Sequence, residues 1–488
     1  MGLIWPQGGH MGQKHYLGLD VGTQSVKGLV FDPEQDHGVI ARAGQPLDLL
    51  PGLPAGAAEQ HPDDWWQAVT QVLRQLAEQI DLSRIAGVGV SGQQHGSVFL
   101  DDSGAVVRPA KLWCDTSTAD EAQQLTQKLG RSVPVGFTAS KVTWLARHEA
   151  ENWQRTTHVL LPHDFINYRL TGSMTMEAGD ASGTGWFDVE ARHFDEAAMK
   201  AVDENLAAKV PRLLETGEVA GHVSESAASA LGLTAGIPVA PGGGDNMMSA
   251  IGSGATRSGV VVMSLGTSGT VFTRTDQPVI DPEGLIAPFC SSDGGWLPLL
   301  CVMNCTNVTE EIRQAYFPDD PDALQRLTDL ASAVEPGCGG VEFVPFIHGE
   351  RVPDLPHATG TITGIRPGGL QPGVIFRAAL EGITANLCSG VARMKRLGVE
   401  VDALRLVGGG SKNPLWRQMI ADTLQVPVTL HEEPESAALG AALQASWICA
   451  GEGKSGEGTS EISCHEKTNR WVPVSSETLK PEATSAES

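Results

Sequence analysis

Two apolar segments in opposite halves of the chain share one pattern, in which an apolar run is followed by a Gly-Thr pair and a second apolar run. The first segment, 16–32, has its turn at Gly22-Thr23, and the second, 259–273, at Gly266-Thr267. Short apolar runs that flank a Gly-containing turn are typical of β-hairpins. Because the two lie half a chain apart, we interpret them as copies of a duplicated domain, not as units of a solenoid, whose period is about 20–50 residues.

Helices and further strands are predicted between and after these hairpins. Apolar residues that return every three or four positions favour helices, and short apolar runs next to glycines favour strands. The predicted elements are helices over 62–79, 375–396 and 434–450, strands over 85–90 and 97–100, and two strand–turn–helix segments over 236–252 and 404–422. This alternation, together with the duplicated hairpins, predicts an α/β protein with two similar domains.

The length and charge of the chain limit the partners it can have. At 488 residues the chain is long enough for two large domains. Its net charge of −24 argues against a nucleic-acid partner, because no basic surface is expected. No run of about 18 apolar residues indicates a membrane span. Eight scattered cysteines and a start without the order of a signal peptide favour reduced thiols and a cytoplasmic location.

The two Gly-Thr turns are candidate phosphate sites. A turn of small residues lets backbone N–H groups approach phosphate oxygens, and a Thr or Ser hydroxyl adds a donor. The candidate ligands are Thr23 in the first turn and Gly266, Thr267 and Ser268 in the second. One such turn alone fits an ordinary β-hairpin, but two matching turns favour phosphate binding.

Two charged residues flank the first turn. Asp20 precedes it, and a carboxylate beside a phosphate would repel it unless a cation lay between them. Asp20 is therefore a candidate to hold Mg²⁺, mainly through waters, since Mg²⁺ usually keeps several of them. Lys27 follows the turn and either meets a phosphate or is a solvated residue of the hairpin.

A run of glycines at 408–410 lies at a predicted strand-to-helix junction. Glycines there allow a flat ligand to lie against the backbone, so we expect an adenosine pocket formed by Gly409, Gly410, Ser411 and Asn413. The alternative is a tight turn with no ligand. The segment is not a Walker A loop, because the Gly-Lys-Ser/Thr ending is missing.

Asp245 is the candidate general base. It follows three glycines at the predicted start of a helix, where the helix dipole favours the ionised carboxylate. In a loose phosphoryl-transfer transition state the hydroxyl loses its proton late, so an aspartate is sufficient to orient and accept it. The alternative is that Asp245 only caps the helix.

A dinucleotide-like pattern occurs at Gly87-Val-Gly89-Val-Ser-Gly92. A nicotinamide site would need a helix after the last glycine, whereas 97–100 is predicted to be a strand and 101–104 a turn. We therefore reject that interpretation. The same loop contains Gln93, Gln94 and His95, which are polar groups able to bind sugar hydroxyls.

Taken together, these segments resemble the FGGY carbohydrate kinases, in the order of that family, over about 15–450. The resemblance implies two duplicated actin-like ATPase (ribonuclease H-like) domains with a cleft between them. It implies a flexible extension over 1–14, a lobe over 15–251 that binds sugar and phosphate, and an ATP-binding lobe over 252–450. A polar, flexible tail is expected over 451–488.

The resemblance also implies a reaction, the ATP- and Mg²⁺-dependent phosphorylation of a sugar that is bound by Gln94, His95, Asp245 and Asn246. Gly92-Gln-Gln-His-Gly96 is similar to the sugar loop of those members that phosphorylate D-xylulose at its 5-hydroxyl, but Gln94 stands where Met is usual. His163 stands where Lys is frequent. The alternatives are another ketose or polyol (ribulose, sedoheptulose or glycerol), a non-catalytic sugar or nucleotide sensor, and a filament protein. The resemblance makes a homodimer plausible.

Overall fold

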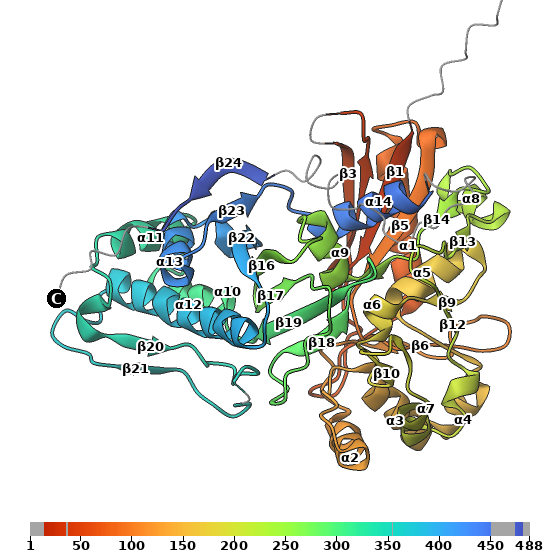
Figure 1. The fold of residues 1–488 in the computed structure, drawn as a ribbon, viewed down its shortest axis with the longest axis horizontal. Helices are drawn as coiled ribbons and strands as arrows, with labels where there is room; N and C mark the ends of the chain where they lie inside the picture. The colour runs from red at the N-terminus through yellow and green to blue at the C-terminus, as the bar shows by residue number, and fades with distance from the viewer. Residues whose placement is uncertain (1–13, 36–37, 354, 450–473, 482–488) are drawn as a thin grey trace, which may run out of the picture. The chain divides into compact units, whose positions relative to one another are not determined.

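The computed structural model describes residues 14–35, 38–353, 355–449 and 474–481. The described chain forms two compact units (Figure 1). Unit 1 consists of the residues up to Gly252 together with the segment that begins at Glu435, and unit 2 consists of Ser253–Pro434 together with the last strand, β24 (Val474–Leu479). Each unit contains one seven-stranded sheet.

The sheet of unit 1 has the strand order β13-β14-β5-β1-β2-β3, and β15 pairs with β5 beside this path. Its strands are β1 (His15–Val21), β2 (Ser25–Phe31), β3 (Val39–Pro46), β5 (Ile85–Gly92), β13 (Gly221–His222), β14 (Pro238–Val239) and β15 (Gly243–Gly244). Antiparallel pairing of β1 with β2 confirms the first predicted hairpin. Strands β1, β14 and β15 are all parallel to β5, so their carboxyl ends point the same way.

Helices cover both faces of this sheet. They are α1 (Pro62–Ala77), α5 (Pro162–Thr171) and α8 (Glu225–Leu231), which pack together, and α9 (Asp245–Gly252) and α14 (Ser436–Cys449), which form a second pair. A Cβ at Gly18 would collide with the backbone of α14, whereas a Cβ at Gly28 would meet Val72 of α1. Gly28 lies opposite Leu19, the neighbour of Gly18, so the two glycines face opposite sides of the sheet. Backbone contact on the glycine side fixes α14 closely against β1.

A second, smaller core lies in the connection between β5 and β14. The main helices here are α2 (Ala119–Leu129), α3 (Thr138–His148), α4 (Ala150–Arg155), α6 (Ala178–Ala181) and α7 (Glu196–Val202). The short strand pairs are β4 (Glu59–Gln60) with β7 (Ala110–Lys111), β6 (Val98–Leu100) with β8 (His158–Leu160), β9 (Thr175–Met176) with β12 (Arg212–Leu213), and β10 (Phe187–Asp188) with β11 (His193–Phe194). Because β6 follows β5 where a nicotinamide site would need a helix, the structure confirms that this pattern is no dinucleotide motif.

The sheet of unit 2 repeats the topology of the first. Its order is β18-β19-β17-β16-β22-β23-β24, and the strands not yet given are β16 (Gly259–Leu265), β17 (Gly269–Thr273), β18 (Ala287–Cys290), β19 (Trp296–Val302), β22 (Val401–Val407) and β23 (Val428–His431). The pairings along β19-β17-β16 are antiparallel, as they are along β3-β2-β1 in unit 1. The pairings along β16-β22-β23 are parallel, as they are along β1-β5-β14 in unit 1. The predicted duplication of an actin-like α/β domain is thereby confirmed.

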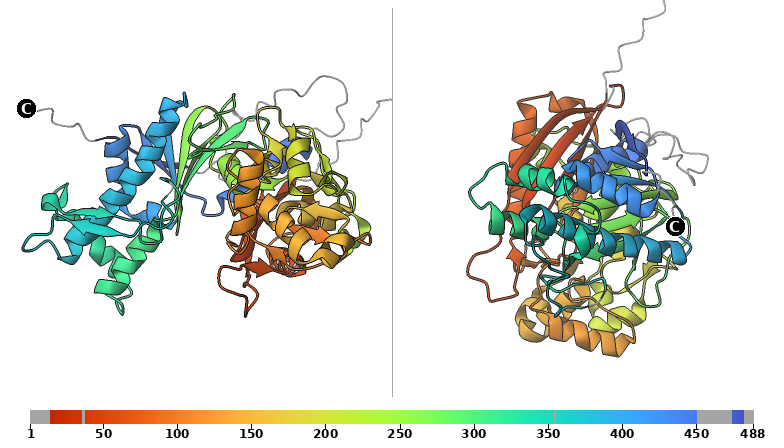
Figure 2. Two further views of the ribbon diagram at one scale, coloured as in Figure 1. Left: turned by 90° about the horizontal axis from the view of Figure 1, so that it is seen from below. Right: turned by 90° about the vertical axis from the view of Figure 1, so that its left-hand side faces the viewer.

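Four helices lie beside this second sheet (Figures 1 and 2). They are α10 (Thr306–Tyr316), α11 (Ala323–Ser332), α12 (Pro372–Arg396) and α13 (Pro414–Leu424), and a hairpin of β20 (Glu342–Val344) and β21 (Thr361–Thr363) packs against α12. Helix α12 begins at Pro372, three residues before the predicted start, because proline is well tolerated in a first helical turn. It is long and apolar enough to cross a membrane, but most of its apolar side chains are buried in the core of unit 2.

The largest difference between the compact units and the ranges expected for the two lobes concerns the last helix, while the boundary expected at 251/252 lies one residue later, after Gly252. Residues 435–449 belong to unit 1, although the sequence order places them after unit 2, because α14 packs on β1 and β5. Of the expected extension over 1–14, all but Lys14 lies outside the described residues. Of the expected polar tail, Val474–Leu479 form β24, antiparallel to β23, and 451–473 and 482–488 lie outside the described residues.

Candidate active site

The carboxyl ends of β1, β5 and β15 bring polar residues together at one edge of the sheet in unit 1. Asp20 of β1 lies opposite Ser91 of β5, and Gly244 of β15 lies opposite Gly92. Asp245 follows Gly244 directly as the first residue of α9. In open α/β sheets ligands bind outside the carboxyl ends of the strands, so this edge is the expected position for a site.

Asp20 lies between Ser91 and Lys27 of the two neighbouring strands and is hydrogen-bonded to Ser91. Ser91 Oγ donates a hydrogen bond to Asp20 Oδ1 at 2.7 Å. Burial and the nearby carboxylate of Glu435 raise the pKa of Asp20, while the bond from Ser91 and the charge of Lys27 oppose this rise. Lys27 lies opposite Asp20 in β2, and its Nζ is 2.7 Å from Glu435 Oε2. The structure therefore gives Lys27 a carboxylate partner, which neither interpretation of the sequence anticipated.

Asp245, Asn246 and Gln94 form a chain of hydrogen bonds. Asp245 Oδ1 accepts from the backbone N–H of Asn246 at 2.8 Å and from its Nδ2 at 3.0 Å. Asn246 Nδ2 also donates to Gln94 Oε1 at 2.9 Å. Gln94 is buried, and its Nε2 has no hydrogen-bond partner among the described residues. Three of the predicted sugar-site residues are thus joined, with one buried donor left for a ligand.

The carboxyl group of Asp245 lies near the carboxylates of Asp20 and Asp180. Burial, followed by the charges of Asp20 and Asp180, raises its pKa to about 7, and the hydrogen bonds from Asn246 only partly oppose the rise. A carboxylate with a pKa near neutrality is well matched to accept a proton at physiological pH. The bonds it accepts come from the next residue, whereas a helix cap accepts from the second or third N–H of the helix.

A buried ion cluster, not anticipated from the sequence, lies close to this site. His163 Nδ1 is 2.7 Å from Asp180 Oδ2, and His163 Nε2 is 3.1 Å from Asp164 Oδ1. Burial alone would lower the pKa of His163, but the two carboxylates outweigh it and raise the pKa to about 9. His163 therefore provides a cation among buried carboxylates, as a lysine would at this position.

His95 is fixed by a short segment that precedes α3. Its backbone has a φ of 65°, its ring lies 4.7 Å from the ring of Phe137, and its carbonyl accepts from Thr138 Oγ1 at 3.2 Å. Lys141 is completely buried and donates to the carbonyls of Val135, Gly136 and Phe137. The structure places His95 next to Gln94 on the same loop, as the sequence predicts, and adds the supporting segment.

The hydroxyl of Thr23 is already used within the protein. It donates to Gln93 Oε1 at 2.9 Å and accepts from Trp113 Nε1 at 3.0 Å. Gln93 Nε2 in turn donates to Gln60 Oε1 at 3.1 Å, and Gln60 Nε2 donates to the Thr23 carbonyl at 2.7 Å. This network fixes the first turn on the end of β5. Any contribution of Thr23 to phosphate binding would therefore come from its backbone N–H.

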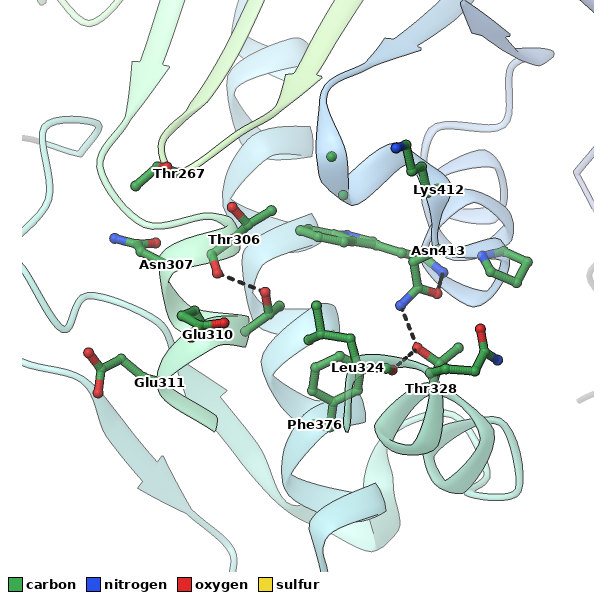
Figure 3. Close-up of a pocket in the computed structure, with 16 residues that line it drawn as sticks. Thr267, Thr306, Asn307, Glu310, Glu311, Leu324, Thr328, Phe376, Lys412 and Asn413 are labelled. Carbon is green, nitrogen blue, oxygen red and sulfur yellow. Dashed lines mark hydrogen bonds between the residues drawn. The ribbon is translucent and has the colours of Figure 1, made fainter. Parts of the chain in front are cut away.

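The second turn, in contrast, borders a pocket of about 700 Å³ in unit 2 (Figure 3). Thr267 lies at one side of the pocket and Asn413 at the other, and Trp416 and Phe376 supply apolar surface. The remaining lining residues are Thr306, Asn307, Thr309, Glu310, Glu311, Leu324, Gln325, Thr328, Gly409, Gly410, Lys412 and Pro414. A pocket of this volume with an apolar lining and a few polar groups is typical of small-molecule sites.

The predicted adenosine segment reaches this pocket only in part. Gly409, Gly410 and Asn413 line it, whereas Ser411 is buried and its hydroxyl donates to the carbonyl of Gly408 at 2.6 Å. Asn413 caps α13 through the N–H of Trp416, and its Nδ2 donates to Thr328 Oγ1 at 2.9 Å. Gly266 and Ser268 belong to the same turn as Thr267 but are not among the lining residues.

The apolar walls of the pocket were not predicted from the sequence. Trp416 and Phe376 are nearly fully buried, and the pattern of α12 and α13 indicates only core residues at such positions. Thr306 comes from the start of α10, and its methyl group lies close to Gly410. An aromatic residue shortly after a glycine turn was the one available signal for a wall of this pocket.

The fold and the two sites together define a class of protein. Two units with the same sheet topology, one with two carboxylates beside amide groups and the other with a pocket at its Gly-Thr turn, fit the sugar kinase that the sequence resemblance implies. Sequence models of the FGGY family of carbohydrate kinases match the chain over 15–252 for the N-terminal domain and 261–449 for the C-terminal domain. The chain therefore belongs to the FGGY family of carbohydrate kinases, which confirms the resemblance.

Individual relatives agree with this assignment. The chain is 38% identical to the xylulose kinase of Haemophilus influenzae over 467 residues, which covers 92% of each. It is 32% identical to the xylulose kinase of Escherichia coli, over 83% of this chain and 84% of that one. Its fold is similar to the crystal structure of xylulose kinase from Rhodospirillum rubrum, with a TM-score of 0.85 and 27% identity over 96% of this chain and 95% of that one.

Proposed function

We propose that this chain transfers the γ-phosphoryl group of ATP to the 5-hydroxyl of D-xylulose, giving D-xylulose 5-phosphate and ADP. The relatives named xylulose kinase that match it over most of its length support the sugar. The observation that carries the proposal is the hydrogen-bonded group of Asp245, Asn246 and Gln94 at the ends of three parallel strands. Such a group can orient a hydroxyl and accept its proton.

In this proposal Asp245 is the general base. The sugar is bound by Gln94, His95 and Asn246, and its 5-hydroxyl donates to the Asp245 carboxylate. Because the transition state of phosphoryl transfer is loose, the proton moves late and positioning contributes more than base strength. The raised pKa of Asp245, about 7, still favours proton acceptance. The proton leaves the hydroxyl for Asp245 as the sugar oxygen bonds to the phosphorus and the bond to the ADP oxygen breaks.

ATP is assigned to unit 2 in this proposal. The adenosine would lie against Trp416 with Gly409, Gly410 and Asn413 around it. The phosphates would meet the backbone N–H groups of the turn over 266–268, together with the hydroxyls of Thr267 and Ser268. In unit 1 the turn that contains Thr23 would offer only backbone N–H groups, and Lys27 would contribute only after releasing Glu435.

Mg²⁺ fits this chemistry through Asp20. Burial and Glu435 raise the pKa of Asp20, so a nearby cation would relieve an unfavourable negative charge. No group of three or more His, Cys, Asp or Glu side chains among the described residues is arranged to hold a metal ion. The ion would thus be held by Asp20, waters and phosphate oxygens, as is usual for Mg²⁺. Its chemical contribution is to neutralise the charge on the phosphates.

Gln94 leaves open a second candidate function, the phosphorylation of another ketose or polyol, because it differs from the residue usual in relatives that phosphorylate D-xylulose. Its buried Nε2 is a donor that needs an acceptor, and a ligand hydroxyl oxygen is one. A methionine at this position would need no acceptor. The competing substrates are those left open by the sequence, ribulose, sedoheptulose and glycerol.

A coupled assay of ADP release over a panel of ketoses and polyols tests the proposal. We expect the highest kcat/KM for D-xylulose and no sugar-dependent ADP release with 5-deoxy-D-xylulose, which lacks the acceptor oxygen. A higher kcat/KM for another sugar would establish the second candidate, and Gln94→Met should then shift the preference toward D-xylulose. If ketoses or polyols that carry the acceptor hydroxyl bound and none of them caused ADP release, the protein would instead be a sensor.

A further inference from the structure

Glu350 is a buried carboxylate to which the proposed reaction gives no role. Its side chain lies in unit 2 and is only 2% exposed. No Lys, Arg or His side chain within ion-pair distance of it occurs in the described parts of the chain. Burying a carboxylate is costly unless its oxygens are fully hydrogen-bonded, so the groups around Glu350 decide how the charge is tolerated.

Four hydrogen-bond donors surround the carboxylate. Glu350 Oε1 accepts from the backbone N–H groups of Met303 and Arg351, each at 2.7 Å. Oε2 accepts from Asn304 Nδ2 at 3.1 Å and from Asn386 Nδ2 at 3.2 Å. Because each partner donates, the site requires an acceptor at both oxygens. An ionised carboxylate meets that requirement and an amide does not.

Two of the four donors, Met303 and Asn304, lie on the connection that leads to the pocket. Met303 and Asn304 join β19 to α10, and Asn304 is fixed further, because its Nδ2 donates to the Gly349 carbonyl at 2.6 Å and its Oδ1 accepts from the N–H of His348 at 3.2 Å. Glu350 and its neighbours thus hold this connection from two sides.

The start of α10 in turn contacts the second Gly-Thr turn. The N–H of Thr306 donates to the carbonyl of Gly266 at 2.9 Å, and the N–H of Asn307 approaches the carbonyl of Thr267 at 3.4 Å. With these carbonyls bonded to α10, the orientation of the peptide groups in the turn is fixed. A continuous set of contacts therefore runs from the Glu350 carboxylate to the turn that borders the pocket.

We infer that Glu350 is a positioning residue for the nucleotide phosphates, because it fixes the β19–α10 connection against which the turn at 266–268 is ordered. The inference rests on the proposed role of that turn in binding ATP. Glu350 is not among the residues that line the pocket, so its loss should weaken the binding of phosphates and leave the binding of adenosine unchanged.

The test compares Glu350→Gln with the wild-type full-length protein by calorimetric titration with MgATP and, separately, with adenosine, in the absence of sugar. We expect the dissociation constant for MgATP to rise about tenfold, because a charged hydrogen-bond network is broken, and that for adenosine to change less than about twofold. For Glu350→Asp, which keeps the charge, the dissociation constant for MgATP should lie between the values of Glu350→Gln and the wild type.

Asp281→Asn is the matched control. Asp281 is a buried carboxylate of the same unit that accepts backbone N–H groups of Glu283, Leu285 and Ile286 and pairs with Arg393. Asp281→Asn should lower the melting temperature, and it should not change the dissociation constant for MgATP relative to that for adenosine. If Glu350→Gln does not fold, Asn304→Ala removes one donor and should give the same selective loss.

Equal weakening of MgATP and adenosine, or no weakening of MgATP, would overturn the inference. Because the readout is nucleotide binding, a protein that phosphorylates none of the tested sugars would contradict the proposed function and leave this test unaffected.

Discussion

The hairpins β1–β2 and β16–β17 share a backbone pattern but carry different side chains at equivalent positions. Asp20 lies two residues before Gly22 and pairs across the hairpin with Lys27, whereas Ser264 lies two residues before Gly266 and pairs with Thr270. A pair of charges in unit 1 is thus replaced by a pair of hydroxyls in unit 2. The duplicated scaffold has kept its strand order and pairing directions, while the turn length, four residues between the pair Val21–Val26 and three between Leu265–Gly269, and the chemistry of the two copies differ.

Thr23 and Thr267, the threonines of the two turns, also differ in their surroundings. The Thr23 hydroxyl is bonded to Gln93 and Trp113, but Thr267 borders an open pocket. Raised carboxylate pKa values at Asp20 and Asp245 occur beside the first turn, and apolar walls occur beside the second. Similar Gly-Thr turns therefore do not imply equal ligands. We assign proton transfer to unit 1 and nucleotide binding to unit 2.

The largest expected effect comes from removing the proposed base. Asp245→Asn should lower kcat by about 10²–10⁴, the usual contribution of a general base, because an amide cannot accept the proton. The dissociation constant of MgATP should not change, since the nucleotide is assigned to the other unit. Rapid-quench kinetics and calorimetry measure the two quantities.

Asp195→Asn is the control for this variant. Asp195 is a true helix cap of the same unit, whose carboxylate accepts from the N–H of Ala198 at 3.0 Å. Its replacement should change stability slightly and leave kcat unchanged. If Asp245→Asn behaved like Asp195→Asn while still binding sugar, Asp245 would be a cap and the assignment of the chemistry to unit 1 would fail.

The elements that depend on neighbours in sequence could be predicted. Both hairpins, the helix from Pro62 and the strand–turn–helix segment after 404 follow local patterns and occur as expected. The unit to which α14 belongs could not be predicted, because it depends on close backbone packing with Gly18 and Gly89, more than 300 residues away in the chain. The only sequence signal of such a contact is a glycine within a strand, and glycines occur in strands for many other reasons.

The site shows the same division. Asp20, Gln94 and Asp245 lie within two residues of glycines at strand ends, and this local signal was sufficient to select them. Partners distant in sequence, such as Trp113 for Thr23 and Asp180 for His163, have no local signal, because only the tertiary fold brings them together. The roles of the selected residues remain predictions until they are measured.

A pH profile gives the next largest effect and sharpens the comparison further. The pKa of Asp245 is raised from 3.8 to about 7, so its carboxylate becomes protonated below that pH. We expect kcat/KM for the sugar, measured with ATP well below its KM, to fall about tenfold per pH unit on the acid side. Asp245→Asn should abolish this limb.

The raised pKa of Asp245 affects the stability of the fold in the direction opposite to its effect on activity. A carboxyl group with a raised pKa in the folded state stabilises the fold below its unfolded pKa and loses that contribution as the pH rises through about 7. The free energy of unfolding should therefore fall with rising pH over 4–7, less steeply in Asp245→Asn than in the wild type. Activity and stability that rose together over this range would contradict the raised pKa.

The smallest expected effect tests the two threonines directly. Thr267→Val should raise the KM for ATP several-fold, because one hydrogen bond to a phosphate is worth about 1–2 kcal/mol. Thr23→Val should leave that KM within about twofold and lower the melting temperature instead, because buried Gln93 and the indole of Trp113 each lose a partner. Initial rates over a range of ATP concentrations and a thermal melt separate the two outcomes. An ATP KM raised equally by both variants would mean that the two turns bind phosphate alike, and the division of roles between the units would have to be given up.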